Sequence, residues 1–435
     1  MRKTVGLGPL DDGGHVVILG GGPAGVACAL MLQRAALGQG RRFQVTILEG
    51  KEFVGERHYN QCVGVLSPPL ADIIGTELGI PFPAHLVRSV IDEYVLHASH
   101  ARLTLAGEGV SSQAVRRVQF DAFMLEQARE RGLSVLTARA VDLEFHADGV
   151  VVYTDAMPLE ADLVVGAFGM DEGSAAIFER LTAYRAPRAL SSVVTKYHPG
   201  DREMEAFGPR IHAFLPRHRR IEFGGVTPKG NHLTINIAGA NVDTQTMQEF
   251  LRLDEVRAVL PSLDRAGTSN ADDLRCYKGR FPVSLGRGCF GDRYVMVGDA
   301  AGLVRAFKGK GVTSAVQTGI RAAETILRTG ISEQAFRADY IPANRDLIVD
   351  IPYGRAMRLL AMVMARVGLF DFILKAGKVE PSLHRALFAA VSGHTPYAQV
   401  WRDGLAPRSI AAIAQAFVLG DRYHGKPALE GKPAR

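Results

Sequence analysis

The chain has few of the residues that carry metal or disulfide chemistry. Its 435 residues include four cysteines, Cys28, Cys62, Cys276 and Cys289, and no two of them form a Cys-x-x-Cys pair. We therefore predict no disulfide framework and no metal site, with a reducing compartment as the default environment. One tryptophan and 7% aromatic residues also leave little material for an aromatic cage.

Long uncharged apolar runs are missing as well. The N-terminal segment, MRKTVGLGPLDDGG, has no apolar core of signal-peptide length. The most apolar later stretch, 356–377, contains Arg358, Arg366, Asp371 and Lys375, so it falls short of the ~20 mostly uncharged residues of a spanning helix. We expect a cytoplasmic protein, and peripheral contact with a membrane surface stays open.

What the chain does have is the composition of a globular protein of two or three domains. It is 47% hydrophobic and 22% charged, and it contains 47 glycines. The net charge of +6 is compatible with an anionic ligand, a nucleic acid or an acidic membrane surface, and selects none of them.

The N-terminal pattern predicts a dinucleotide-binding βαβ unit. A buried strand over 15–19 runs into a glycine-rich turn, a small-residue helix follows, and a second strand covers 43–48. The turn reads Gly20-Gly21-Gly22-Pro23-Ala24-Gly25 and fits G-x-G-x-x-G, with Glu49 at the end of the second strand. The glycines permit a tight turn and close approach of a pyrophosphate, and Glu49 can accept hydrogen bonds from a ribose diol.

A second motif lies more than 250 residues further on. The run YVMVGDAAGLVRAFKGKGVT, 294–313, predicts a buried strand that ends at Gly298 and Asp299, followed by a glycine-rich loop that opens a helix near Gly311 and Val312. An aspartate at a strand end can bind a ribityl hydroxyl, and helix N–H groups can face the pyrimidine edge of a flavin. The two motifs together favour FAD over NAD(P), and no second G-x-G-x-x-G unit follows for a nicotinamide cofactor.

These segments resemble the FAD-binding core of the para-hydroxybenzoate hydroxylase-like superfamily, and within it the geranylgeranyl reductase family. Supporting segments are R-V-Q-F-D at 117–121, A-D-L-V-V-G-A-F-G at 161–169 and N-Q-C-V-G-V-L at 60–66, which is similar to the reductases' C-x-G segment beside the flavin. The resemblance covers roughly residues 15–340. One departure is the stretch 210–216, RIHAFLP, which has no tryptophan where the reductases carry Y-x-W-x-F-P on the substrate sheet.

The resemblance implies roles for single residues. The cofactor-binding set is Gly20, Gly22, Pro23, Ala24, Gly25, Glu49, Arg117, Gly298, Asp299, Gly309, Lys310, Gly311 and Val312. Cys62 is the candidate catalytic residue, since a thiol beside a flavin could donate a proton to a reducing alkene; the alternative is a small residue that lines the pocket. Lys308 and Lys310 could stabilise a negative charge or be solvated loop residues.

The middle and the end of the chain follow other patterns. Short strands at 211–215, 220–226 and 233–238 predict an antiparallel meander, and a polar helix is expected over 244–260. His212, His218, His232 and nearby basic residues, Lys229 among them, form a basic patch that we interpret as a solvated hairpin rather than a site for an anionic head group. From about Tyr340 the spacing of apolar residues is helical.

The predicted fold is α/β, with an α+β substrate domain. A Rossmann-like FAD-binding domain would be assembled from 14–60, 110–170 and 280–340, an antiparallel-sheet substrate domain from 61–109 and 171–279, and a C-terminal helical cap from 341–435. The cap could cover an apolar pocket or lie on a membrane, and a plain cover over the core is favoured.

We expect an FAD-dependent oxidoreductase that reduces C=C bonds of a hydrophobic, prenyl- or lipid-like substrate, with NAD(P)H or another electron donor. The first alternative is a flavin monooxygenase acting on a small aromatic or secondary-metabolite substrate; the W-x-W-x-I-P signature of flavin halogenases is absent. An alternative of another class is an FAD-bound electron carrier or scaffold that transforms no small molecule. We expect no nucleic-acid partner, and the sequence leaves the oligomeric state open.

Overall fold

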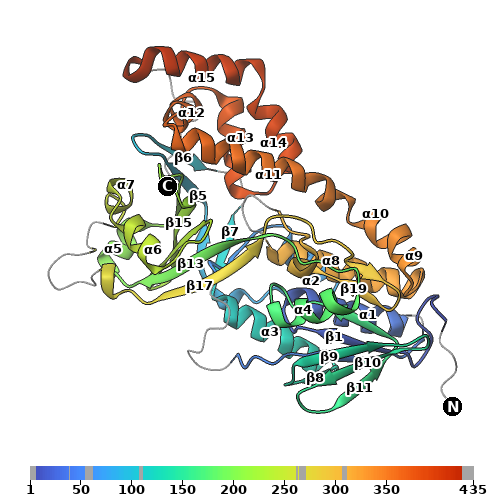
Figure 1. Cartoon of the computed structure of the whole chain (residues 1–435). Coiled ribbons are helices and arrows are strands. Elements are labelled where there is room, and N and C mark those ends of the chain that lie inside the picture. Colours follow the sequence, from blue (N-terminus) through green and yellow to red (C-terminus); the bar gives the residue numbers. More distant parts are fainter. Residues whose placement is uncertain are drawn as a thin grey trace.

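A six-stranded, mostly parallel sheet forms one end of the computed structural model (Figure 1). The structure describes residues 6–38, 40–53, 62–106, 111–260, 263, 271–305 and 311–423. The strand order is β18 (Phe290–Gly291), β19 (Tyr294–Met296), β12 (Leu163–Gly166), β1 (His15–Leu19), β2 (Gln44–Leu48) and β8 (Ser134–Leu136), with only the β18–β19 pair antiparallel. The predicted strands at 15–19 and 43–48 are confirmed.

Three helices cover this sheet: α1 (Pro23–Gly38), α3 (Arg117–Glu130) and α8 (Gly311–Arg328). The central strands β19, β12 and β1 are therefore entirely buried. α1 and α8 pack closely on each other, and a Cβ at Gly319 would lie 2.2 Å from the Ala24 carbonyl oxygen. Glycine and alanine in both helices allow this approach, so the two halves of the predicted site lie side by side despite their separation in sequence.

Smaller elements complete this end. An antiparallel sheet is formed by β9 (Ala140–Phe145), β10 (Val150–Thr154) and β11 (Pro158–Ala161), and α4 (Glu172–Leu181) packs on β9. A second small sheet, β3 (Val65–Leu66), β7 (Ser112–Val115) and β4 (Val87–Ile91), leads toward the other half of the molecule. Short helices here are α2 (Leu70–Thr76), α9 (Glu333–Ala335) and α10 (Ile341–Ala343).

A seven-stranded sheet forms the other half. Its order is β17 (Cys276–Pro282), β13 (Ala189–Tyr197), β16 (His232–Gly239), β15 (Ile221–Lys229), β14 (Arg210–Phe214), β5 (Glu93–His97) and β6 (Arg102–Ala106). The predicted meander is confirmed in β14–β15–β16, whereas β14 pairs with β5 in parallel. One face of the sheet packs on α5 (Asp201–Phe207), α6 (Thr244–Leu251) and α7 (Asp254–Arg257).

The helix predicted over 244–260 is wrong in its extent. α6 ends at Leu251, because Leu253 adopts an extended backbone with ψ 138°. The break lets Val256 and Leu260 enter the same core as Phe250 and Leu251.

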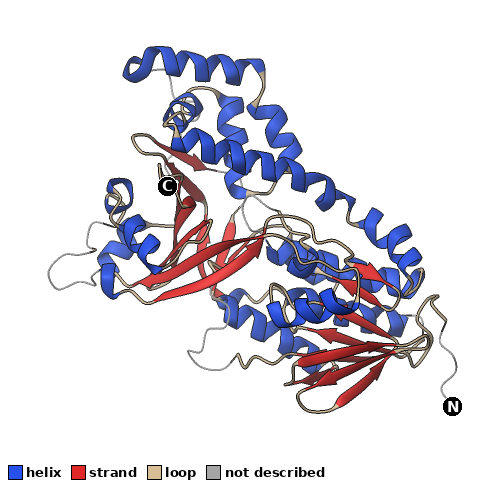
Figure 2. Cartoon of the chain, viewed as in Figure 1, coloured by secondary structure: helices blue, strands red, loops and turns tan. Residues whose placement is uncertain are grey.

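The C-terminal residues are helical, as predicted. The helices are α11 (Arg345–Arg366), α12 (Phe370–Gly377), α13 (Pro381–Ser392), α14 (Tyr397–Gly404) and α15 (Pro407–Leu419). Figure 2 shows them gathered at the end of the molecule opposite the parallel sheet, beside β5 and β6. Within the described ranges, no helix combines the length and the hydropathy needed to cross a membrane.

Candidate functional site

A cavity of about 1220 Å³ runs from the carboxyl ends of the parallel strands to the C-terminal helices. Its walls come from the β1–α1 turn, the residues after β19, one face of the seven-stranded sheet and helices α11 to α15. Ligand cavities usually measure roughly 300–1,000 Å³, so this one has room for more than one small molecule.

The glycine-rich turn forms one end of the cavity. Gly20 has φ +115°, and a Cβ there would lie 2.4 Å from the Ala167 carbonyl oxygen. A Cβ at Gly25 would lie 2.0 Å from the Gly20 carbonyl oxygen, whereas a Cβ at Gly22 would meet nothing within 4 Å. Gly22 lines the cavity, so the turn is tight on its inner side and open on the side where a phosphate would lie.

Glu49 lies directly beside this turn. Its Oε2 atom accepts a hydrogen bond from the Gly21 N–H at 3.0 Å, and its Oε1 atom accepts one from the Lys51 N–H at 2.9 Å. Each carboxylate oxygen keeps a further lone pair for a hydroxyl donor in the cavity.

Asp299 and the start of α8 form the adjoining wall, next to the start of α1. The N–H of Gly298 donates to Thr318 Oγ1 at 2.9 Å, which fixes the bend after β19. Asp299 faces the cavity, and the described part of the chain gives its carboxylate no hydrogen-bond partner. Burial raises the pKa of Asp299 and the Arg117 charge opposes the rise, so a ligand hydroxyl would satisfy this carboxylate.

α8 begins at Gly311, and both Gly311 and Val312 line the cavity. Free N–H groups of a first helical turn suit an electron-rich ring edge. The predicted Gly309 and Lys310, together with Lys308, lie outside the described residues.

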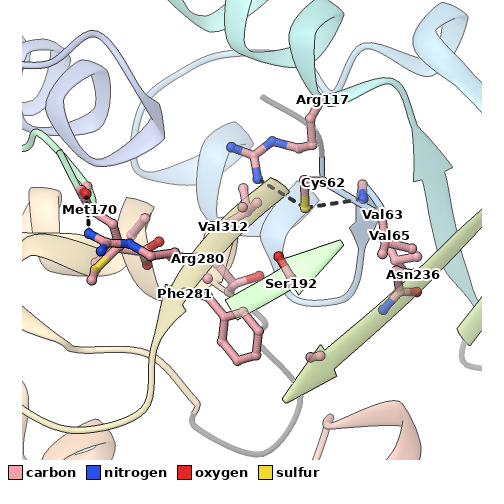
Figure 3. Close-up of a pocket in the computed structure, with 18 of the residues that line it drawn as sticks. Cys62, Val63, Val65, Arg117, Met170, Ser192, Asn236, Arg280, Phe281 and Val312 are labelled. Carbon is pink, nitrogen blue, oxygen red and sulfur yellow. Dashed lines mark hydrogen bonds between the residues drawn. The ribbon is translucent and has the colours of Figure 1, made fainter. Parts of the chain in front are cut away.

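Cys62 and Arg117 meet at the centre of the site (Figure 3). Arg117 Nη1 donates to Cys62 Sγ at 3.9 Å, and the Gly64 N–H donates to the same sulfur at 3.4 Å. Arg117 also binds Asp121 through Nε at 3.2 Å and Nη2 at 3.0 Å. Burial opposes its charge, yet Asp121 and Cys62 raise the pKa of Arg117, so it remains a fixed cation. The contacts with Asp121 hold the Arg117 guanidinium beside the Cys62 sulfur.

Lys229 corrects the expectation of a solvated hairpin. It is only 4% exposed, and its Nζ donates to the Cys62 carbonyl oxygen at 3.4 Å. Burial lowers the pKa of Lys229 to about 8, while Cys62 acts in the opposite direction. Its neighbour His232 is also buried, whereas Arg217 and Arg219, which precede the other end of β15, are exposed. Arg117 and Lys229 thus fix the Cys62 segment from two sides.

The wall formed by the seven-stranded sheet changes character along its length. Near Cys62 it is polar, with Ser192 and Asn236 (Figure 3). Thr227 also lines the cavity, and Arg280 lies further along the wall, where its guanidinium pairs with Glu172 and donates to the Met170 carbonyl oxygen at 3.4 Å. Toward the C-terminal helices it is apolar: Leu96, Ile211, Ala213 and Phe223 face Met357, Leu360, Met364, Ile373 and Leu387. The segment 210–216, which differs from the Y-x-W-x-F-P pattern of the reductases, contributes Ile211 and Ala213 to this apolar part. It contains no tryptophan.

The predicted site residues that the structure describes divide into two groups. Those that line the cavity are Gly20, Gly22, Pro23, Ala24, Glu49, Cys62, Arg117, Asp299, Gly311 and Val312. Gly25 and Gly298 lie behind the wall, where Gly298 packs on Ala24 and Ala315. The sequence interpretation missed Ser192, Asn236, Arg280 and the burial of Lys229, because no local motif marks them.

The fold matches that of known FAD-dependent oxidoreductases. The chain resembles a geranylgeranyl bacteriochlorophyll reductase-like protein from Thermoplasma acidophilum, with a TM-score of 0.68 and 13% identity over 94% of this chain and 99% of the other. A flavin-dependent brominase matches with a TM-score of 0.61 and 16% identity over 94% of this chain and 100% of that one. The predicted fold class is thereby confirmed.

In sequence, the chain is 24% identical to the chloroplastic geranylgeranyl diphosphate reductase of Nicotiana tabacum over 336 residues, which are 72% of this chain and 66% of that protein. No protein-family model matches. The resemblance to geranylgeranyl reductase-like flavoproteins is confirmed, and the chain is similar in sequence and fold to FAD-dependent oxidoreductases.

Proposed function

We propose that the protein is an FAD-dependent reductase that adds hydrogen across a C=C bond of a hydrophobic, prenyl- or lipid-like substrate. The observation that carries the proposal is the continuity of the cavity from the glycine turn, past Cys62, to a long apolar end. The similarity to geranylgeranyl reductase-like proteins supports the same substrate class.

The residues present fit FAD. Gly22 leaves open space for a pyrophosphate, Glu49 has lone pairs for the adenosine ribose, and Asp299 lacks a hydrogen-bond partner among the described residues. When bound, FAD would take a hydride from a donor and deliver it to an alkene carbon.

The chain's own side chains then position the substrate and supply the proton. The apolar walls around Ile211 and Met364 bind and orient a hydrocarbon chain and exclude water from it. Cys62 lines the polar part of the cavity, and its S–H group would supply the proton to the second alkene carbon. Arg117 and Lys229 hold the Cys62 segment in this position.

A specific observation favours monooxygenation as the second candidate. Ser192 and Asn236 place hydrogen-bonding groups on the sheet wall near Cys62, where they could orient a small polar aromatic compound. The likeness to a flavin-dependent brominase is compatible with this reaction.

Oxygen consumption and product analysis in the presence of NAD(P)H distinguish the candidates. The reductase predicts a saturated product with no coupled oxygen uptake, and the monooxygenase predicts oxygen uptake with incorporation of one oxygen atom. An electron carrier predicts no product from any small molecule and turnover only with a partner protein.

A further inference from the structure

The outer face of α11 carries an unusual row of exposed apolar side chains. Val349, Tyr353, Leu360, Val363 and Val367 are 39–56% exposed, and their spacing of three, four or seven residues places them on one side of the helix. More than half of the large exposed apolar side chains in the described chain belong to the C-terminal helices or the turns that follow them. We call these five residues, four on α11 and Val367 directly after it, the α11 stripe.

The exposed charged side chains of the C-terminal helices are basic from Arg355 onward. From Arg355 to Arg422, every exposed charged side chain whose burial the structure describes is basic, including Arg366, Arg402 and Arg408. The acidic Asp371 is buried, and Glu380 and Asp403 are half-buried. An exposed apolar row on a helix, within a helical region whose exposed charges are basic, is typical of helices that lie on anionic membranes.

The cavity reaches this surface. Leu360 belongs to the α11 stripe and also lines the cavity, and Leu405, after α14, is 53% exposed and lines it as well. The side of α11 that faces the cavity, with Met357 and Met364, is adjacent to the stripe around the helix. The apolar end of the cavity therefore opens beside the exposed apolar surface.

We propose that the α11 stripe docks on the surface of a bilayer that contains anionic lipids, and that the cavity takes its substrate directly from that bilayer. None of the described helices can cross a membrane, so the protein would lie on it. The route of entry rests on the proposed function, whereas docking itself depends only on the stripe and the charge.

Flotation of the full-length protein with phosphatidylcholine vesicles, with and without phosphatidylglycerol, tests the docking. We expect strong binding only to the anionic vesicles. Val363 and Val367 do not line the cavity, so the double variant V363E/V367E should keep its flavin and its circular dichroism spectrum but bind at least about tenfold more weakly. The control L37E changes a residue that is 67% exposed on α1 and should bind as the unchanged protein does.

Three results would overturn the proposal: no binding by the unchanged protein, equal binding by V363E/V367E, or a dimer in solution that V363E/V367E converts to a monomer. Turnover of a short alkene dispersed without vesicles tests the proposed reaction separately. Failure of that turnover with intact vesicle binding would reject the reaction and leave the docking.

Discussion

At the scale of single residues, the proposed reaction depends on two charged side chains, Arg117 and Lys229, that contact Cys62. Lys229 is the most informative, because burial lowers its pKa to about 8 and it contacts the Cys62 carbonyl oxygen. Above about pH 8 the side chain loses its charge in the folded protein, and its hold on the Cys62 segment weakens.

Lys229→Met should lower kcat by about tenfold or more, in keeping with the ~1.5–3 kcal/mol of a hydrogen bond to a charged group. It should also remove a decline in kcat near pH 8. Lys229→Arg keeps a charge that does not titrate, so it should retain more activity and also lose the decline. If kcat of Lys229→Met still declines near pH 8, the decline belongs to another titrating group.

Asp299 gives a second prediction at this scale. Asp299→Ala removes a carboxylate that lines the cavity beside the start of α8, so the purified variant should retain several-fold less FAD. The flavin-to-protein absorbance ratio measures this, with Asp148→Ala, an exposed position, as the control. Equal flavin content in both variants would remove Asp299 from the site.

Gly20, Glu49 and Asp299, which line the cavity, could be singled out from the sequence because each follows a strand within a short, regular pattern. Their roles toward FAD stay predictions. The role of Lys229 could not be found in this way. Its burial depends on packing against Cys62, 167 positions away in the chain, and a lysine in a hairpin is by default a solvated residue.

At the scale of elements, the β1–α1 turn permits a matched comparison of two glycines. Gly25→Ala places a Cβ 2.0 Å from the Gly20 carbonyl oxygen and should destabilise the protein by about 1–3 kcal/mol. Gly22→Ala meets no atom within 4 Å, so thermal stability without cofactor should not change, whereas FAD affinity should fall because the new methyl group enters the cavity.

Thermal unfolding and FAD titration of both variants measure the two effects. Loss of stability in Gly22→Ala with unchanged FAD affinity would show that this turn serves only the fold.

The neighbouring strands β5 and β14 carry a pair of histidines, His97 buried and His212 half-buried. His97 Nε2 lies 2.8 Å from His212 Nδ1, and burial lowers the pKa of both rings. Since the unfolded chain binds protons near pH 6.5 and the folded pair does not, stability should be complete above that pH and fall as the pH drops toward 4. The slope should reach up to about 1.4 kcal/mol per pH unit for each proton.

His212→Asn should reduce this slope in urea unfolding experiments between pH 6.5 and 4, because one titrating group is removed. The exposed His85→Gln serves as the control. An unchanged slope in His212→Asn would mean that the histidine pair does not govern acid sensitivity.

The elements themselves could be predicted where the pattern is local. The parallel strands, the start of α1 and the meander follow from periodicity and turn residues. The parallel pairing of β14 with β5 could not be predicted, because the strands are more than 100 residues apart and no local signal distinguishes one partner from another.

At the scale of the whole molecule, one cavity joins the flavin motifs to the C-terminal helices. The two FAD motifs predicted a domain assembled from distant segments, and the domain limits stay a prediction. The extent of the cavity could not be predicted, because it depends on how far α11 to α15 stand away from the seven-stranded sheet.

A side chain that fills the apolar end tests this continuity. Ala213→Trp should reduce kcat/KM for a long prenyl substrate by at least tenfold and affect a short alkene much less, because only the long chain reaches beyond β14. Equal losses for both substrates would indicate a general disturbance of the sheet.

The central claim is that this chain passes a hydride through FAD to a hydrophobic alkene. The most direct measurement is an anaerobic single turnover, in which protein loaded with FAD is reduced and mixed with a polyprenyl substrate while the flavin absorbance is followed. If reduced FAD transfers a hydride to the alkene, the oxidised flavin spectrum should return in proportion to the number of double bonds that become saturated. Reduced flavin that stays reduced with every alkene, and reoxidises only when oxygen is admitted, would contradict it.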